Sequence, residues 1–268
     1  FKKIVGNYGY PVGNLKGKKA IVTGATKGIG LATATQLAAE GADVAICART
    51  KEDVDRVVET LSETGSNVSG EAVDLYDMDA YLKWLEQTAN DMGGCDIFIS
   101  NVTGGTAMAP EDAFSAKGFQ GYFDVDLMCS VKGFDALLPS LQASESASAI
   151  FISSTAALEH FPPSPPAFMA LKAALITQTK TLSQQHGKDG IRVNAVSPGP
   201  VYIEGGAWEY VKNNMPDLYE QTISNLPLGR MASAEEVGKY IAYVASPATS
   251  FITGANCIID GGLTKTVG

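Results

Sequence analysis

Three side chains in the second half of the chain have types and a spacing that bear on catalysis. Ser154 directly follows an apolar run that is typical of a buried strand, and its hydroxyl can hydrogen-bond a substrate oxygen. Lys172 lies in the next helical stretch, where its ammonium can donate hydrogen bonds and supply positive charge. Phe168 precedes Lys172 by four residues, so we expect both side chains on one helix face. Because a phenyl ring neither donates nor accepts a proton, this group has no evident acid or base.

A glycine-rich turn follows the first predicted strand. It reads Thr23-Gly24-Ala25-Thr26-Lys27-Gly28-Ile29-Gly30 and leads into the first predicted helix. Glycines allow a tight turn and a close approach of the backbone to a pyrophosphate, and the helix N-terminus offers free N–H groups. Such loops also serve as plain turns. At the first strand–helix junction of an alternating chain, however, this one predicts a dinucleotide site.

Two basic residues favour a phosphorylated dinucleotide. A second strand that selects NAD usually ends in an acidic residue, which holds the ribose 2′-hydroxyl. Here Ala48 stands at that place and is followed by Arg49 and Thr50. Arg49 can form a bidentate fork with a 2′-phosphate, and Lys27 adds a second cation. We therefore predict NADP(H), with NAD(H) as the alternative if both cations are ordinary surface charges.

Further motifs stand at the ends of later predicted strands. Asp74 and Leu75 follow the third strand, and Asn101 follows the fourth within the run Ser100–Gly105. The remaining motifs are the run Val193–Pro200 with Val201 after it, the pair Thr253-Gly254 and the triplet Asp260-Gly261-Gly262. In this order the motifs make the chain similar to the short-chain dehydrogenase/reductase family over roughly residues 17–263.

The resemblance implies the cofactor contacts and the roles of the catalytic group. The cofactor contacts are Gly24, Thr26, Lys27, Gly28, Ile29, Gly30, Arg49, Thr50, Asp74, Leu75, Asn101, Lys172, Pro198, Gly199 and Val201. Asp74 corresponds to an adenine-contacting aspartate, although it could instead cap the helix that begins near Asp77.

In the family, a hydride passes between a nicotinamide and a carbonyl carbon while a tyrosine protonates the oxygen. Ser154 corresponds to the serine that binds this oxygen, and Lys172 to the lysine that acidifies the tyrosine and holds the nicotinamide ribose. Phe168 stands at the tyrosine position. Asp126 stands where an asparagine supports a water relay, and a carboxylate can accept from that relay but cannot donate unless protonated. The predicted catalytic residues are thus Ser154, Phe168, Lys172 and Asp126.

The phenylalanine at position 168 predicts a catalyst of low activity, because general acid–base catalysis contributes about 10²–10⁴-fold. Two other residues are candidates for a substitute proton donor: His160, in the connector after Ser154, and Tyr202, near the start of the segment 200–228. Phe168 has three explanations: a tyrosine removed on purpose, a natural loss that leaves a non-catalytic NADP(H)-binding sensor, or an enzyme with another donor or another chemistry such as dehydration. Retention of Ser154, Lys172 and the cofactor motifs favours the first. The predicted parent activity interconverts a ketone and a secondary alcohol.

The substrate residues are predicted from the segments that follow the catalytic strands. They are Gly104, Ser154, His160, Phe168, Tyr202 and Trp208. Their aromatic and apolar character indicates a cyclic or aromatic small molecule. Residues 200–228 carry no strand signal and are interpreted as a substrate lid, the alternative being a helical hairpin packed as ordinary core.

The elements that must position these residues alternate between strands and helices. Strands are predicted at Lys19–Thr23, Asp43–Cys47, Val68–Val73, Ile97–Ser100, Ala149–Ser153, Arg192–Ser197 and Cys257–Ile259. Helices are predicted near 28–40, 51–64, 77–92, 111–142, 166–187 and 233–245. The apolar strands suit burial on both faces. The pattern predicts one α/β domain, residues 1–268, with a Rossmann-like, doubly wound parallel sheet of about seven strands and helices on both faces.

Composition excludes several other classes of protein. A formal charge of −9 argues against a nucleic-acid partner, and scattered cysteines with two distant histidines argue against a metal site. No apolar run is long enough to span a membrane and no signal peptide is visible, which favours a cytoplasmic protein. The family resemblance implies a homodimer or homotetramer, with its two long helices, near 111–142 and 166–187, pairing between copies.

Overall fold

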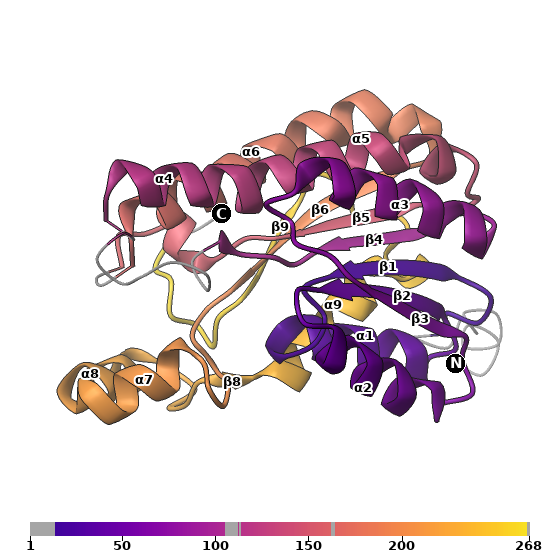
Figure 1. The fold of residues 1–268 in the computed structure, drawn as a ribbon. Coiled ribbons are helices and arrows are strands. Elements are labelled where there is room, and N and C mark those ends of the chain that lie inside the picture. Colours follow the sequence, from indigo (N-terminus) through magenta and orange to yellow (C-terminus); the bar gives the residue numbers. More distant parts are fainter. Residues whose placement is uncertain (1–13, 105–111, 113, 162–163, 267–268) are drawn as a thin grey trace, which may run out of the picture.

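The computed structural model describes residues 14–104, 112, 114–161 and 164–266. It is built on a seven-stranded parallel sheet (Figure 1). The strands run in the order β3-β2-β1-β4-β5-β6-β9. Their bounds are β1 Lys19–Thr23, β2 Asp43–Ala48, β3 Val68–Ala72, β4 Ile97–Ser100, β5 Ser148–Ile152, β6 Arg192–Pro198 and β9 Asn256–Ile259. The strand order reverses between β1 and β4, and such switch points are where open parallel sheets bind ligands. The predicted Rossmann-like sheet is confirmed.

Two hydrophobic layers cover the two faces of this sheet. Alternate residues of a strand point to opposite faces, and in β1 Ala20 and Val22 join one layer while Ile21 joins the other. The first layer packs under α1 (Gly28–Ala39), α2 (Lys51–Ser62) and α9 (Ala234–Ala245). The second packs under α3 (Met78–Met92), α5 (Cys129–Gln142) and α6 (Pro166–His186). Figure 1 shows the two groups of helices on opposite sides of the strands.

The edge strand β3 differs from the prediction that all strands are buried on both faces. Its residues after Val68 are exposed, because only one strand, β2, lies beside it. The central strands do fit the prediction, and every residue of β5 and β6 is buried.

The long helix expected over 111–142 is interrupted and starts later. Its α-helical part α4 (Ala116–Tyr122) begins after Ser115, whose side chain accepts a hydrogen bond from the Gly118 N–H. A π-helical turn, η3 (Phe123–Met128), then separates α4 from α5. The prediction of one continuous helix was wrong. A π-helical turn has one residue more than an α-helical turn, and the spacing of apolar residues in the sequence does not reveal that extra residue. Such turns are frequent at functional sites, and Asp126 lies within this one.

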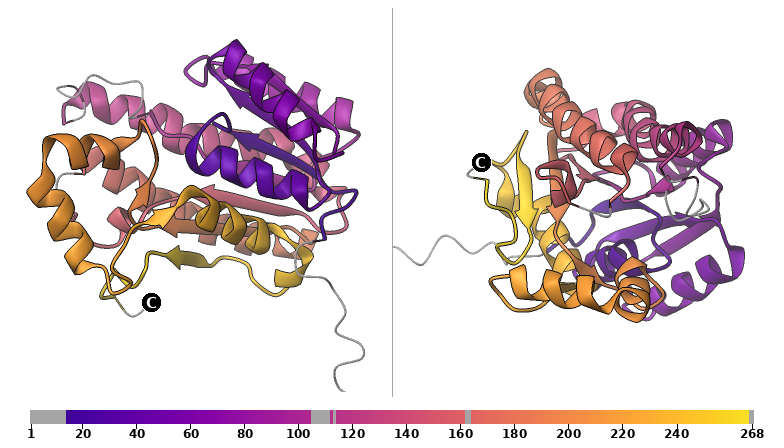
Figure 2. Two further views of the ribbon diagram at one scale, coloured as in Figure 1. Left: turned by 90° about the horizontal axis from the view of Figure 1, so that it is seen from below. Right: turned by 90° about the vertical axis from the view of Figure 1, so that its left-hand side faces the viewer.

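The segment 200–228 contains two helices and a short strand. The prediction that it has no strand was wrong, because β7 (Val201–Tyr202) pairs in parallel with β8 (Ala232–Ser233). A strand of two residues is too short to leave a periodic signal. None of the eight described residues of α7 (Ala207–Asn214) is buried, and α8 (Pro216–Asn225) buries only Thr222 among its described residues. Figure 2 shows both helices, in orange, at one end of the molecule.

Among the described residues, no helix is both long and apolar enough to cross a bilayer.

Candidate active site

The predicted site residues follow the carboxyl ends of six neighbouring parallel strands. Thr26 and Lys27 follow β1, Arg49 and Thr50 follow β2, and Asp74 and Leu75 follow β3. Asn101 and Gly104 follow β4, Ser154 and His160 follow β5, and Pro198, Gly199, Val201 and Tyr202 end or follow β6. Because the strands are parallel, these loops emerge at one edge of the sheet, where the switch between β1 and β4 also lies.

Three of the predicted catalytic residues come from two elements, the turn after β5 and helix α6. Ser154 caps the 3-10 turn η4 (Thr155–Ala157), and its Oγ accepts a hydrogen bond from the Ala156 N–H at 3.1 Å. Phe168 and Lys172 lie one turn apart on α6, and Lys172 Nζ is 5.7 Å from the centre of the Phe168 ring. That distance suits an attraction between a cation and an aromatic face. The expected shared helix face is therefore present.

Lys172 is buried and faces three acceptors. Its Nζ lies 2.9 Å from Asp126 Oδ1, 2.9 Å from the Ile152 carbonyl oxygen and 3.4 Å from the Val102 carbonyl oxygen. An ammonium group has three protons to donate. Two of them go to the carbonyl oxygens of Ile152 and Val102, and the contact with Asp126 is an ion pair without hydrogen-bond geometry.

Asp126 has no exposed side-chain surface and uses both of its oxygens. Oδ1 pairs with Lys172, and Oδ2 accepts a hydrogen bond from the Gly104 N–H at 2.6 Å. Oδ2 is therefore hydrogen-bonded, whereas among the described residues Oδ1 has only the charge of Lys172 and no hydrogen-bond donor in good geometry. Burying an ion pair is costly unless the attraction between its charges offsets their loss of water. The carboxylate thus joins α6, the π-helical turn and the loop after β4.

The neighbouring serine, Ser153, has a structural contact. It is 4% exposed, and its Oγ donates to the Lys172 carbonyl oxygen at 2.8 Å. Ser153 therefore fastens α6 to the end of β5, while Ser154 is half-buried. In addition, Thr155 Oγ1 donates to the Pro198 carbonyl oxygen at 3.3 Å, which ties η4 to the end of β6.

Two tyrosines near the catalytic group were missed by the sequence analysis. The Tyr122 ring meets the Phe168 ring edge-on, with 5.8 Å between centres. Burial, then the charge of Asp126, raises the pKa of Tyr122 to about 12. Burial and then Asp126 also raise the pKa of Tyr76, whose hydroxyl donates to the Gly104 carbonyl oxygen at 3.4 Å. The helical spacing of four residues between Tyr122 and Asp126 was the only available signal for this neighbourhood.

The glycine turn has the geometry of an anion cradle. Gly24 and Gly28 have φ of 63° and 57°, in the left-handed region that disfavours other residues. A Cβ on Gly30 would collide with the Gly24 carbonyl oxygen and the Asn101 amide. Asn101 Nδ2 in turn donates to the Thr23 and Gly24 carbonyl oxygens at 3.3 and 3.2 Å. Among the described residues, the Lys27 side chain makes no capping hydrogen bond to α1. The first backbone N–H groups of α1 can therefore donate to a phosphate. The residues present therefore fit a dinucleotide.

The other predicted cofactor residues are partly exposed and partly packed. Arg49 and Lys27 are exposed, as a phosphate clamp requires. Asp74 Oδ1 accepts from the Tyr76 N–H at 3.1 Å, whereas the cap of α3 is Asp77. Leu75 is 6% exposed and belongs to the hydrophobic layer under α3.

The predicted substrate residues contact different parts of the structure. Gly104 is buried, and a Cβ there would lie 2.6 Å from the Gly121 carbonyl oxygen, so this glycine serves the close approach of α4. Trp208 of α7 meets Phe161 edge-on, with 6.1 Å between ring centres. Tyr202 contacts its own segment, with its hydroxyl 3.4 Å from Glu209 Oε1 and Lys212 over its ring.

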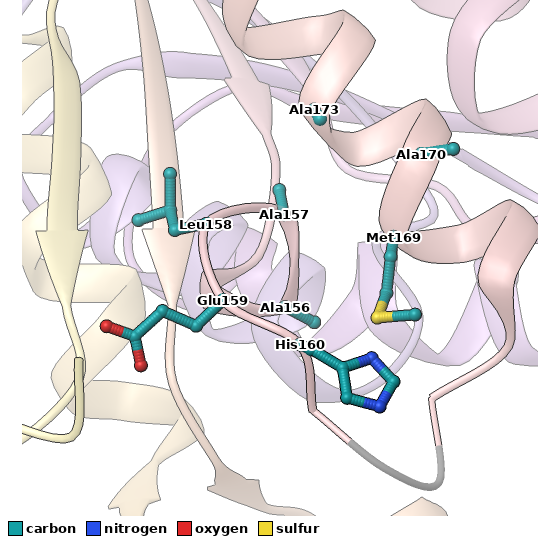
Figure 3. A pocket seen from close by; sticks show the side chains of 8 residues that line it. All are labelled: Ala156, Ala157, Leu158, Glu159, His160, Met169, Ala170 and Ala173. Atoms are coloured by element: carbon teal, nitrogen blue, oxygen red, sulfur yellow. The ribbon is translucent and has the colours of Figure 1, made fainter. Parts of the chain in front are cut away.

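His160 lies on a separate hollow of about 300 Å³ between η4 and α6 (Figure 3). Ser154, Phe168 and Lys172 are not among the described residues that line it, which are Ala156, Ala157, Leu158, Glu159, His160, Met169, Ala170 and Ala173. Figure 3 shows His160 near Met169, with Glu159 extending the opposite way. There Glu159 Oε1 accepts from the backbone N–H groups of Lys265 and Thr266.

Comparison with known proteins places this geometry in a family. A family model described as "Enoyl-(Acyl carrier protein) reductase" matches residues 24–264. Isoepoxydon dehydrogenase of Penicillium expansum is 35% identical over 252 residues, covering 93% of this chain and 95% of that protein. A tropinone reductase homolog of Arabidopsis thaliana is 33% identical, covering 94% of each. The crystal structure of L-sorbose reductase from Gluconobacter frateurii, complexed with NADPH and L-sorbose, superimposes with a TM-score of 0.85 at 29% identity, covering 96% of this chain and 100% of that one. The chain belongs to the short-chain dehydrogenase/reductase family.

Proposed function

We propose that the chain is an NADP(H)-dependent oxidoreductase that interconverts a ketone and a secondary alcohol, with turnover lowered by Phe168. One observation carries the proposal. Lys172 Nζ lies 5.7 Å from the Phe168 ring and donates to the carbonyl oxygen of Val102, the residue after Asn101, whose side chain donates to Gly24 of the glycine turn. We take Phe168 as standing at the position of the family's proton donor.

The cofactor choice is supported by charge. Arg49 and Lys27 are exposed cations on the loops that follow β2 and β1, and Ala48 offers no carboxylate to a ribose 2′-hydroxyl. The reductase of similar fold from Gluconobacter frateurii was solved with NADPH. These features favour NADP(H) over NAD(H).

The chain's own residues would divide the work as follows. A bound nicotinamide would supply or accept the hydride. Ser154 would hydrogen-bond the substrate oxygen and so orient the carbonyl. Lys172, held by Asp126, would hold the nicotinamide ribose. Phe168 has no proton to give to that oxygen, so in this proposal the proton comes from water. A rate loss of about 10²–10⁴-fold is the expected consequence.

The substrate class and the assembly follow from the surroundings. We take residues 200–228 as a lid within a single domain, because α7 and α8 bury almost none of their described residues and Trp208 meets Phe161. Aromatic walls of this kind suit a cyclic or aromatic substrate. Pairing of α5 and α6 between copies, as in the family, would give a homodimer or homotetramer.

A non-catalytic NADP(H)-binding protein is the second candidate, since Phe168 lacks a hydroxyl and Lys172 already has three acceptors. The discriminating experiment restores the phenol with Phe168→Tyr, alone and combined with Asp126→Asn, which removes the carboxylate that pairs with Lys172. NADPH absorbance is then followed with a panel of cyclic and aromatic ketones. With at least one ketone, a restored variant should consume NADPH faster than the parent protein, by which we mean the chain with Phe168. If the parent and every restored form bind NADPH but reduce nothing, the binding protein is the better account.

A further inference from the structure

The charge of Lys172 is already balanced in this structure. Asp126 lies 2.9 Å from its Nζ, and neither side chain is more than 4% exposed. The family's lysine makes a neighbouring phenol more acidic because an unbalanced positive charge stabilises the phenolate. Two opposite charges this close act on a neighbour as a dipole, whose influence falls faster with distance than that of a lone ammonium. The Asp126–Lys172 pair is therefore poorly suited to acidify a phenol.

The two departures from the family pattern are neighbours in space. Lys172 contacts the carboxylate of Asp126 at one side and lies 5.7 Å from the Phe168 ring at another. An aromatic ring without a hydroxyl is compatible with an ion-paired lysine, because the ring needs neither a hydrogen bond nor a positive charge from that lysine. A phenol at position 168 would have to compete with Asp126 for the same ammonium.

We propose that Asp126 is a positioning residue that holds Lys172 in a charge-neutral buried pair, so that a hydroxyl returned at position 168 becomes an effective acid only when residue 126 is also uncharged. The inference rests on the proposed oxidoreductase function for its catalytic consequence. Its electrostatic part concerns only Asp126, Lys172 and position 168, and can be measured without a substrate.

Among the described residues, three titratable groups lie around position 168, and a fourth lies near Asp126. Lys172 lies on the same helix, Asp126 comes from the π-helical turn, and Tyr122 comes from α4. Tyr76, from the connection between β3 and α3, completes the set near Asp126. After burial, the carboxylate of Asp126 is the largest cause that raises the pKa of both Tyr122 and Tyr76. A phenol at position 168 would feel the same carboxylate, in the same direction.

The decisive experiment titrates the introduced phenol by its ultraviolet absorbance. Phe168→Tyr and Phe168→Tyr/Asp126→Asn are each measured as a difference spectrum against the protein with Phe168, because ten other tyrosines contribute a background. Removing the charge at residue 126 should raise the ionisation constant of the introduced phenol about tenfold or more, which is one pKa unit. In the same pair of variants, kcat for ketone reduction should rise about tenfold or more.

Asp124→Asn is the matched control. It removes the same charge from the same turn, but Asp124 is bonded to Gln120 at 2.8 Å and lies at the half-exposed surface. In the Phe168→Tyr background it should change the phenol's ionisation constant by less than about twofold. If Asp126→Asn does not fold, Asp126→Ser replaces it, since a hydroxyl can still accept from Lys172 Nζ.

Each outcome decides the inference. If Phe168→Tyr alone yields a phenol that titrates a full unit or more below the ordinary value of about 10, the inference is overturned, whether or not any Asp126 variant folds. An equal shift with Asp124→Asn overturns it as well. If the phenol responds to residue 126 as predicted but no form reduces a ketone while all bind NADPH, the inference stands and the proposed function fails.

Discussion

At the level of single residues, the site combines an intact framework with two substituted positions. Ser154, Lys172 and the glycine turn form the framework that we propose for carbonyl reduction, and a Cβ on Gly30 would collide with Gly24 and Asn101. Phe168 has no hydroxyl to donate a proton, and Asp126 lies 2.9 Å from Lys172 Nζ. Both differences from the family pattern affect how a proton reaches the substrate oxygen. Neither replaces a residue of the glycine turn or of the predicted phosphate clamp.

The choice of cofactor is testable at one side chain. Arg49→Ala should weaken NADP⁺ binding about tenfold or more, because a hydrogen bond between charged partners contributes about 1.5–3 kcal/mol. NAD⁺ has no 2′-phosphate, so its binding should change by less than about twofold. Isothermal titration calorimetry measures both affinities. Arg56→Ala is the control, because Arg56 is an exposed cation of α2 that pairs with Asp53 at 2.9 Å. Equal losses for NADP⁺ and NAD⁺ would refute the phosphate clamp.

At the level of elements, the cofactor cradle depends on how α1 is held. α9 packs against α1 so closely that a Cβ on Gly238 would lie within 2.8 Å of the Ala32 backbone. α9 begins with a capping box, in which the Ser233 side chain accepts from the Glu236 N–H and Glu236 accepts from the Ser233 N–H. Arg230 also donates to Glu236, at 2.7 and 2.8 Å. The start of α9 is thereby fixed on the face that supports α1.

This capping box predicts a dependence of stability on pH. The hydrogen bond from Arg230, then that from the Ser233 N–H, lowers the pKa of Glu236 from 4.5 to about 2. A carboxyl whose folded-state pKa is lowered stabilises the fold above its unfolded pKa and loses that contribution as pH falls toward the folded pKa. Glu236→Gln should therefore lower the melting temperature at neutral pH, and its difference from the parent should shrink between pH 4.5 and about pH 2. Thermal melts followed by circular dichroism test this. A difference that stays constant over that range would contradict it.

At the level of the whole molecule, the sheet could be predicted from the sequence and part of the site could not. β1 and β4 were predicted to the residue, because a buried parallel strand is a short apolar run between turn signals. The pair Asp126–Lys172 was expected only as a neighbourhood, since its contact depends on the π-helical turn. Tyr122 was missed for the same reason.

The helices α7 and α8 show the other limit of the sequence. A hairpin was weighed there only as a packed alternative to a lid, and the structure has two helices with almost no buried surface among their described residues. Apolar residues such as Tyr210 and Met215 lie exposed, at 63% and 41%. Periodicity reports which side of a helix faces a core, so it gives little information where no core lies beneath.

We propose that this site transfers hydride although Phe168 stands at the position of the proton donor. NADPH carrying deuterium at the nicotinamide C4 tests it most directly, because the label follows the hydride whatever group supplies the proton. The parent protein, incubated for a long time with a reducible cyclic ketone, should place deuterium on the carbinol carbon. Phe168→Tyr/Asp126→Asn should do so faster. Bound NADPH with no deuterium in any alcohol, in the parent and in the restored variant alike, would contradict the account.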